Sequence, residues 1–363
     1  MLIRTVPWEV PLKKIFIAAS LGAIALTACQ QGGPGGQGGG GGGSRDQIQI
    51  VGSSTVYPFA TAVAEQFVRN NPGFKAPIIE STGTGGGMKL FCAGVGVQHP
   101  DIENASRRIK KSEFEDCTKN GVKQIIEVPI GIDGIALVED KGSAQFALTQ
   151  ADIYKALAAT PFGKPNSAKT WKDVNPALPA VEIRVYGPPP TSGTRDAFNE
   201  LILDKGCNTD AAMKALKDSD ADKHKEICTK IRTDGAFIEG GENDNLLVQK
   251  VTANPGSLGI MGYSFLEENA DKVKGIAIGG VSPTAETIAT YQYPGSRPLY
   301  LYVKGDHLTA IRGIREFLAE FEKGWAPGAY LSRKGLIPLQ PDKLAVAAQQ
   351  VKELKPVTAD GLE

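Results

Sequence analysis

Three short segments of the chain combine glycine with serine and threonine, and each lies between an apolar strand-like run and a helix-like run. They are Gly52-Ser53-Ser54-Thr55, the stretch TGTGGG at residues 82–87, and Pro190-Thr191-Ser192-Gly193-Thr194. The first N–H groups of a helix lack partners within it, and the helix dipole makes this end partly positive. Glycine lets the backbone approach a ligand closely, and the hydroxyls add donors. A single such turn is often a simple helix cap, but three of them predict an anion site.

The strands and helices around these turns follow from hydrophobic spacing. Residues 47–51 alternate as a short strand does, and apolar residues recur at helical spacing from Val56 to Phe67. A strand at 181–186 precedes the third turn, and a helix begins near Arg195. Each turn is therefore expected to connect a strand to a helix.

Familiar nucleotide and nucleophile motifs do not fit the turns. Met88 stands where a dinucleotide fingerprint needs its third glycine, and the spacing from Gly83 to Lys89 breaks the P-loop pattern. The third turn lacks the first glycine of a nucleophile elbow. The chain has 3 histidines, none at ligand spacing, and no CxxC pair. We therefore expect no catalytic residue, no metal site and no cofactor.

The N-terminal region has the pattern of an exported lipoprotein. Lys13 and Lys14 precede an apolar run at 15–26, which is the right size for a signal-peptide core and short for a membrane span. The run ends in Leu-Thr-Ala-Cys29, which resembles the bacterial lipobox. We expect a signal peptide at 1–28, a lipidated Cys29 and a flexible glycine-rich tether at 29–46. An ordinary secretion signal is the alternative.

The remaining cysteines indicate disulfides. Without Cys29, an even number is left in a chain bound for an oxidising compartment. The sequential pairs Cys92–Cys117 and Cys207–Cys228 are our prediction, because each closes a short local loop. The sequence alone does not exclude other pairings.

The composition points to a two-lobed protein without a nucleic-acid partner. From residue 47 onward the body has about 300 residues, more than one core usually serves. Lys and Arg number 40, as do Asp and Glu, so there is no net charge to attract nucleic acid. Strand–helix alternation predicts an α/β fold with mostly parallel sheets and helices on both faces. Ligands in such folds bind beyond the carboxyl ends of strands, where the three turns lie.

Six stretches, in order along the chain, resemble the periplasmic phosphate-binding proteins of ABC importers, the PstS/SphX family. They are VGSSTVYPFA, TGTGGGMKLFCAG, ENASRRIK, GIDGIALV, YGPPPTSGTRDAF and ENDNLLVQKVTANPGSLGIMGYSF. The resemblance implies a two-lobed periplasmic-binding-protein fold of the type II kind, with crossing hinge strands. It also implies that the lobes close over inorganic phosphate and that a membrane permease receives it.

The resemblance also assigns contact residues, and they fall on the three turns. The implied phosphate contacts are Ser54, Thr55 and the backbone N–H of Val56 in the first turn, Thr84 and Gly85 in the second, and Ser192, Gly193 and Thr194 in the third.

Two departures from the family pattern affect the charges. Arg107 stands where the best-known members have a phosphate-facing aspartate, and Pro188 stands where they have an arginine. We expect Arg107 and Arg195 to supply the positive charge, each through a bidentate fork, with a surface ion pair as the alternative for either. Asp133 is our candidate for the carboxylate that accepts the phosphate proton and repels sulfate. A salt bridge on the hinge would explain Asp133 equally well.

These considerations predict a division into lobes and a set of partners. Lobe one would comprise 47–130 and 262–345, lobe two 131–261 with the hinge strands, and 346–363 a C-terminal tail. We expect a monomer, anchored by lipid to a bacterial membrane in the periplasm, that binds phosphate and an ABC permease. The alternatives are a binding protein for sulfate, molybdate or tungstate, or a phosphate-related hydrolase or adhesin on the same fold.

Overall fold

The computed structural model describes residues 45–143, 146–241 and 243–362, all within a compact unit from Gly42 to Glu363. The predicted signal peptide, Cys29 and the predicted tether up to residue 44 lie outside the described residues. Arg45 and Asp46, the last residues assigned to the tether, both form ion pairs: Arg45 lies 2.6 Å from Asp101, and Asp46 lies 2.8 Å from Lys75.

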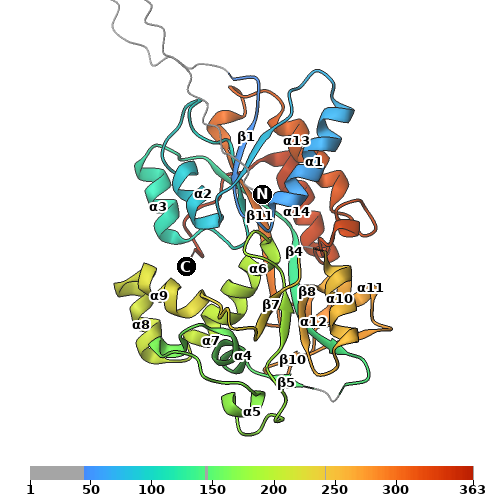
Figure 1. Cartoon of the computed structure of the whole chain (residues 1–363). Helices are drawn as coiled ribbons and strands as arrows, with labels where there is room; N and C mark the ends of the chain where they lie inside the picture. The colour runs from blue at the N-terminus through green and yellow to red at the C-terminus, as the bar shows by residue number, and fades with distance from the viewer. Residues whose placement is uncertain (1–44, 144–145, 242, 363) are drawn as a thin grey trace, which may run out of the picture. The chain divides into compact units, whose positions relative to one another are not determined.

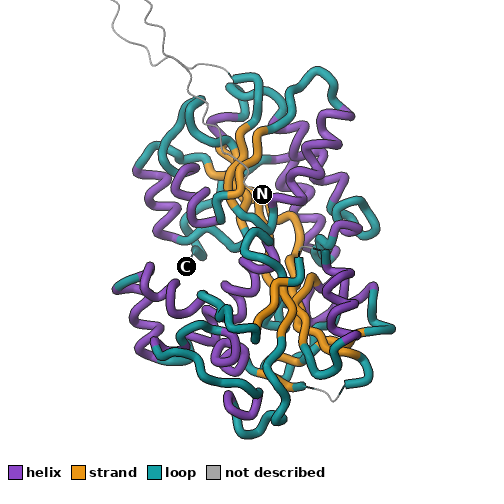
Figure 2. The backbone as a smooth tube through the Cα atoms, in the orientation of Figure 1, coloured by secondary structure: helices purple, strands orange, loops and turns teal. Residues whose placement is uncertain are grey.

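A nine-stranded sheet runs through the body in the order β2-β1-β3-β11-β4-β8-β6-β7, with β9 paired to β4. Figure 2 shows these strands in orange between the helices. Their bounds are β1 Gln49–Gly52, β2 Ile78–Ser81, β3 Ile102–Ala105, β4 Ile125–Asp140, β6 Val185–Gly187, β7 Phe237–Glu239, β8 Leu258–Gly262, β9 Val273–Gly275 and β11 Ser296–Lys304. A separate pair joins β5 (Ala147–Leu148) to β10 (Ala277–Ile278).

Strand β4 belongs to both halves of this sheet. Its residues 125–134 pair antiparallel with β11, and residues 135–139 pair antiparallel with β8. The sequence IIEVPIGIDGIALVED is nearly continuous in apolar residues, as expected of a strand covered on both faces. Pro129 lies at the β-bulge opposite Tyr300, a place where a missing backbone donor is tolerated.

The outer strands of each half are parallel. Strands β2, β1 and β3 are parallel to one another in the first half, and β7, β6 and β8 are parallel in the second. Each half therefore presents a row of carboxyl strand ends, the edge at which α/β folds bind ligands.

Helices cover both faces of the sheet, as Figure 1 shows. In the first half α1 (Tyr57–Asn70), α13 (Ile314–Gly324) and α14 (Pro341–Glu353) lie on one side, with α2 (Thr84–Phe91) and α3 (Lys111–Lys119) on the other. The second half carries α4 (Gln150–Leu157), α5 (Trp171–Val174), α6 (Gly193–Phe198), α7 (Asp204–Cys207), α8 (Ala211–Ser219), α9 (Ala221–Thr229), α10 (Asp244–Ala253), α11 (Tyr263–Glu268) and α12 (Ala285–Ala289). A π-helical turn at Asn199–Leu203 connects α6 to α7.

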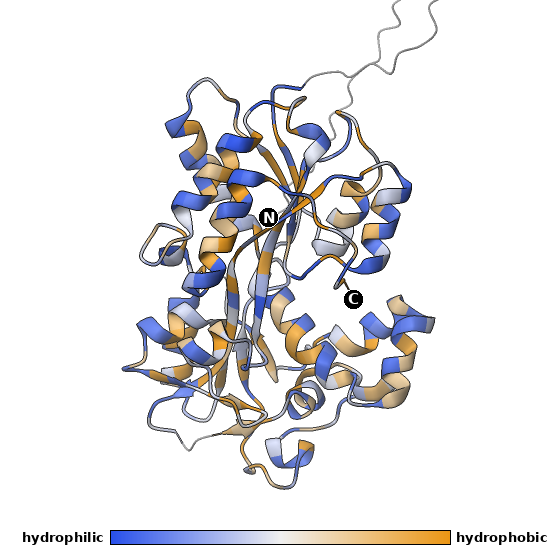
Figure 3. Cartoon of the chain, turned by 180° about the vertical axis from the view of Figure 1, so that it is seen from behind, coloured by the Kyte–Doolittle hydropathy of each residue, from blue (hydrophilic) through white to orange (hydrophobic). Residues whose placement is uncertain are grey.

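The helices turn apolar stripes toward the strands. In Figure 3, where the ribbon is coloured by residue hydropathy, the helices carry both blue hydrophilic and orange hydrophobic residues. On α13 the apolar stripe is formed by Ile314, Phe317, Leu318 and Phe321, which are all buried. A second, smaller core lies under α2 and α3 and includes Met88, Phe91 and Cys117.

The predicted limits of the two lobes stay a prediction. Two strand pairings and one helix involve residues on both sides of those limits. Strand β9, in the range assigned to lobe one, pairs with residues 138–140 of β4, and β10 pairs with β5. Helix α14 continues across the boundary placed between residues 345 and 346.

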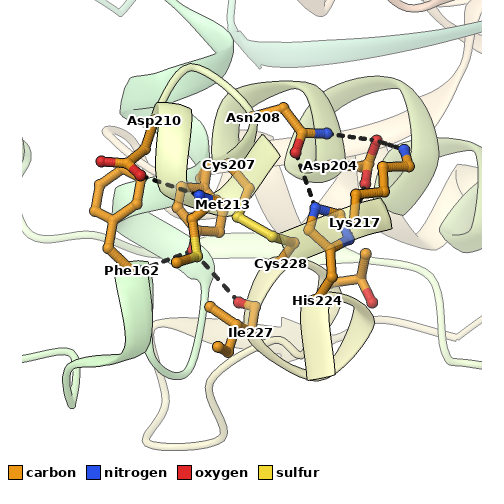
Figure 4. Close-up of a disulfide and its surroundings, with 12 residues drawn as sticks. Phe162, Asp204, Cys207, Asn208, Asp210, Met213, Lys217, His224, Ile227 and Cys228 are labelled. Atoms are coloured by element: carbon orange, nitrogen blue, oxygen red, sulfur yellow. Dashed lines mark hydrogen bonds and ion pairs between the residues drawn. A yellow bond between two sulfur atoms is a disulfide. The ribbon is translucent and has the colours of Figure 1, made fainter. Parts of the chain in front are cut away.

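Both predicted disulfides are present. Cys92 at the end of α2 is bonded to Cys117 of α3, and Cys207 of α7 is bonded to Cys228 of α9. Figure 4 shows the second bond with His224 beside it. Ligand atoms of His224 and both sulfurs lie within 4.8 Å of one another, a proximity that sequence spacing did not reveal. The two sulfurs are bonded to each other, so they are not free thiolates.

Across the described part of the chain, the helices are too short or too polar to span a bilayer.

Candidate anion-binding site

Three loops that follow parallel strands make up the candidate site. The first loop (residues 53–56) connects β1 to α1, the second (82–83) connects β2 to α2, and the third (188–192) connects β6 to α6. Because the strands in each half are parallel, all three loops lie at carboxyl strand ends.

The first and third loops are in direct contact, although they come from different halves of the sheet. Ser54 Oγ donates to the carboxylate of Asp196 in α6, and Thr55 Oγ1 donates to the Gly193 carbonyl at 3.2 Å. A Cβ at Gly193 would lie 2.7 Å from Thr55 Cα and 2.8 Å from the Ser54 carbonyl oxygen. Glycine at this position therefore permits the contact.

The second loop is held beside the first. The Thr82 N–H donates to the Gly52 carbonyl at 2.9 Å, and Gly87 of α2 packs directly on Gly52. A Cβ on Gly87 would lie 2.5 Å from Gly52 Cα, so a larger residue would push α2 away. The three loops predicted from composition are thus gathered in one region of the molecule.

Backbone N–H groups of the first and third turns already have internal hydrogen-bond partners in this structure. Ser53 Oγ accepts from the N–H of Thr55 at 3.2 Å and of Val56 at 3.4 Å. Ser192 Oγ accepts from the Thr194 N–H at 3.2 Å. A bound anion would exchange these internal acceptors for its own oxygens, so these N–H groups remain suitable donors.

The second loop has a similar internal partner. Thr84 is buried, and its Oγ1 accepts from the Ser106 N–H at 3.1 Å and lies 3.0 Å from the Ser106 hydroxyl. Gly85 is exposed. A Cβ at this position would lie 4.0 Å from Arg107 Nη2.

Arg107 lies next to the second loop but directs its fork at Glu113. Its two Nη atoms donate to the two carboxylate oxygens at 2.9 and 2.7 Å. Desolvation lowers the pKa of Arg107, but hydrogen bonding to Glu113 and the charges of Glu113, Glu200 and Glu103 raise it overall. The ion-pair alternative for Arg107 therefore describes this structure, and its role in anion binding stays a prediction.

Arg195 is buried and packs within the second half. Its guanidinium lies 4.5 Å from the centre of the Phe237 ring, and Nη1 donates to the Pro188 carbonyl at 2.8 Å. Desolvation lowers its pKa, against the opposing charges of Glu239 and Asp196. A phosphate contact by Arg195 stays a prediction.

A different arginine, Arg297 of β11, contacts the first loop. Its Nη2 donates to Thr55 Oγ1 at 2.7 Å, its Nε donates to Asp133 at 3.1 Å, and its Nη1 donates to Glu200. The side chain is 6% exposed. One guanidinium thus joins the first loop, strand β4 and the helical segment that follows the third loop.

Asp133 lies on β4 and forms a salt bridge, the alternative role that the sequence left open for it. Its side chain is 15% exposed and pairs with Arg297. Burial raises the pKa of the Asp133 carboxyl, Arg297 lowers it, and the charge of Glu200 raises it again. The proposed role of Asp133 as a proton acceptor stays a prediction.

Glu103 of β3 is a further carboxyl next to the second loop. It is fully buried, and its oxygens would lie 2.1 Å from a Cβ on Gly87 and 2.7 Å from one on Gly52. Burial raises its pKa well above the usual range, Glu113 raises it further and Arg107 lowers it. This shift favours the neutral form of the Glu103 carboxyl.

Comparison with known proteins assigns the family. The model of the PBP superfamily domain matches residues 38–322. The chain is 33% identical over 313 residues to protein SphX of Synechococcus elongatus, across 84% of this chain and 81% of SphX. It is equally similar, at 33% over 313 residues and 84% of each chain, to the phosphate-binding protein PstS of Staphylococcus saprophyticus. The chain belongs to the PstS/SphX family.

A solved structure supports the fold of this PstS/SphX protein. The crystal structure of "a possible phosphate binding protein" from Planctomyces limnophilus superposes with a TM-score of 0.68 at 28% identity, and the match covers 85% of this chain and 98% of that one. The predicted two-lobed α/β binding-protein fold is confirmed. PstS/SphX proteins are substrate-binding proteins, so this chain is not an enzyme.

Arg297, Glu200 and Asp196 are site residues that the sequence reasoning missed. Arg297 lies near the start of the otherwise mostly apolar strand SRPLYLYVK, and a charge in such a strand signals a buried group that needs partners. Glu200 and Asp196 gave no comparable signal, because both lie on a helical segment with ordinary polar spacing.

Proposed function

We propose that this PstS/SphX protein binds inorganic phosphate with high affinity between its three loops and delivers it to an ABC-type permease. The observation that carries the proposal is the meeting of the three glycine- and hydroxyl-rich loops beside the Arg297 guanidinium. The name of the PstS relative agrees with this ligand.

In this proposal the loops supply N–H and hydroxyl donors, and arginine supplies the charge. The contacts are those predicted in the three turns: Ser54, Thr55, Val56, Thr84, Gly85, Ser192, Gly193 and Thr194. We assign the principal cation to Arg297, because it donates to the first loop, whereas Arg195 donates to the Pro188 carbonyl. Micromolar affinity needs about 8 kcal/mol net, which several hydrogen bonds and one buried charge can supply.

Delivery follows from closure of the two lobes about the crossing strands. Phosphate would bind the closed state more tightly than the open state, and the permease would recognise the closed state. Strand β4 is the natural hinge, since it pairs with strands of both halves. We further propose an extracytoplasmic monomer tethered to the membrane through lipid on Cys29.

Calorimetric titration of the purified protein with phosphate, sulfate and molybdate tests the ligand. We expect one phosphate per chain with micromolar or tighter affinity and little heat from the other two. Tighter binding of sulfate or molybdate would favour a different oxyanion as the cargo. If none of the three anions gives a heat of binding, the proposal is wrong.

Small-angle X-ray scattering tests closure separately. The radius of gyration is expected to fall when phosphate is added, because the open lobes approach each other. If phosphate binds in the calorimeter and the scattering curve stays unchanged, the hinge mechanism is wrong although the ligand is right.

A further inference from the structure

The Glu200 carboxylate contacts the buried Arg297 guanidinium from a side chain that is 57% exposed. Arg297 Nη1 donates to Glu200, while Nε and Nη2 donate to Asp133 and Thr55. Glu200 lies on the π-helical turn that continues α6, the helix that begins at the third loop. Its contact with Arg297 spans 97 residues of sequence.

Glu200 also acts on the other charged groups of the site. Desolvation lowers the pKa of Arg107, and Glu113 and then Glu200 raise it. Burial raises the pKa of Asp133, Arg297 lowers it, and Glu200 adds a smaller increase. A single carboxylate therefore lies within electrostatic range of the arginine beside the second loop and the arginine beside the first. An anion held by the three loops would lie within range of the same two arginines.

Carboxylate and phosphate use guanidinium N–H groups in the same way, through oxygen lone pairs. One N–H cannot serve both at full strength. We propose that Glu200 is an internal competitor for the anion: its carboxylate contacts Arg297 Nη1, and the anion must displace it to bind. The inference rests on the proposed phosphate function and adds an affinity-setting residue to that site.

The exposures of the two carboxylates indicate which one moves. The Glu200 side chain is 57% exposed and extends from the π-helical turn. The Asp133 side chain is 15% exposed and extends from the central strand β4. Release of an exposed carboxylate to water costs little, because it was never fully desolvated. Asp133 instead stays and holds Arg297 in place. Glu200 thus lowers affinity, and Asp133 supports it.

The test compares phosphate titrations of the wild-type protein with Glu200→Gln. Glutamine keeps the size of the side chain but removes its charge. We expect binding about threefold to tenfold tighter at low salt, with the gain shrinking as ionic strength rises from about 0.01 M to about 0.15 M. Because the side chain is exposed, the variant is expected to fold normally, which its circular dichroism spectrum and melting temperature verify.

Two further variants serve as controls. Glu65→Gln removes the same charge from an exposed position on α1 and should leave the affinity unchanged. Asp133→Asn should weaken binding, because Arg297 loses its strand-held partner. These opposite signs separate competition from a general effect of net charge.

The outcomes distinguish the inference from the function on which it rests. If the wild-type protein binds phosphate and Glu200→Gln binds it with equal or lower affinity, the competitor role is wrong and the proposed function stands. A wild-type protein that binds no anion overturns both. Tighter binding by Glu200→Gln but also by Glu65→Gln assigns the gain to net charge and overturns the competitor role.

Discussion

One buried guanidinium, that of Arg297, organises the charges of the site. Its three nitrogen atoms donate to Asp133, Glu200 and Thr55, which lie on a central strand, a helical segment and a loop. A planar fork with fixed N–H directions can serve three such acceptors at once, whereas an ammonium group cannot match them in the same geometry.

Arg297→Lys therefore tests the cation at the residue scale. We expect phosphate binding at least tenfold weaker, because a charge-assisted, directional contact is lost while the charge itself remains. Arg184→Lys is the matched control, since Arg184 forms an ion pair with Glu182 at an exposed position. A folded Arg297→Lys protein with unchanged affinity would show that Arg297 is not a ligand of the anion.

Asp244 makes stability depend on pH. Burial raises its pKa from 3.8 to about 6, although the Gly262 N–H opposes the shift. The folded state then binds more protons than the unfolded state between about pH 4 and about pH 6, so this residue lowers stability as pH rises through that window. The loss of unfolding free energy amounts to about 3 kcal/mol and is complete above about pH 6.

Asp244→Asn should remove this contribution and stabilise the protein at neutral pH relative to wild type. Urea unfolding of both proteins from about pH 4 to about pH 7 measures the difference. The exposed Asp218→Asn is the control. Parallel stability curves for wild type and Asp244→Asn would contradict the assigned shift.

At the scale of elements, each loop depends on close approach to its neighbour. The third loop reaches the first because Gly193 has no side chain, and α2 reaches β1 because Gly87 has none. These contacts bring strand ends from different parts of the sheet into one site. Glycine at such positions therefore matters for packing as well as for ligand access.

Gly193→Ala and Gly85→Ala form a matched pair. The added methyl at Gly193 would lie 2.7 Å from Thr55 Cα, so we expect a loss of about 1 to 3 kcal/mol in unfolding free energy and weaker phosphate binding. At Gly85 the added methyl would meet only Arg107 Nη2, at 4.0 Å, so stability should hold. Denaturant unfolding and calorimetry measure both properties. Equal stability of the two variants would refute the packing argument.

At the scale of the molecule, the described disulfides lie within the halves of the sheet and not across them. Cys92–Cys117 links α2 to α3 in the first half, and Cys207–Cys228 links α7 to α9 in the second. Each closes a local loop, with sequence separations of 25 and 21 residues. Such bonds restrain the unfolded chain and would leave the proposed movement between the halves free.

Cys207→Ala/Cys228→Ala should therefore lose stability but keep its ligand. We expect about 2 to 4 kcal/mol less unfolding free energy, with the phosphate dissociation constant within about twofold of wild type. The variant Cys92→Ala/Cys117→Ala provides the comparison. Cys92 lies at the end of α2, the helix that follows the second loop. A large loss of affinity in the Cys207 variant would mean that the bond positions the site.

Local features of this protein were determined by its sequence alone. The strand–turn–helix units and the two disulfides depend on residues a short distance apart in the chain, and their patterns predicted them. The family resemblance likewise rests on contiguous motifs such as VGSSTVYPFA.

The charge partners of the site were decided only by the tertiary structure. Arg297 lies 97, 164 and 242 residues from Glu200, Asp133 and Thr55, respectively. No local pattern relates residues so far apart, because their distance in space depends on the strand order β3-β11-β4 and on where the loops meet. The sequence therefore indicated an anion site, while folding determined which arginine and which carboxylates surround it.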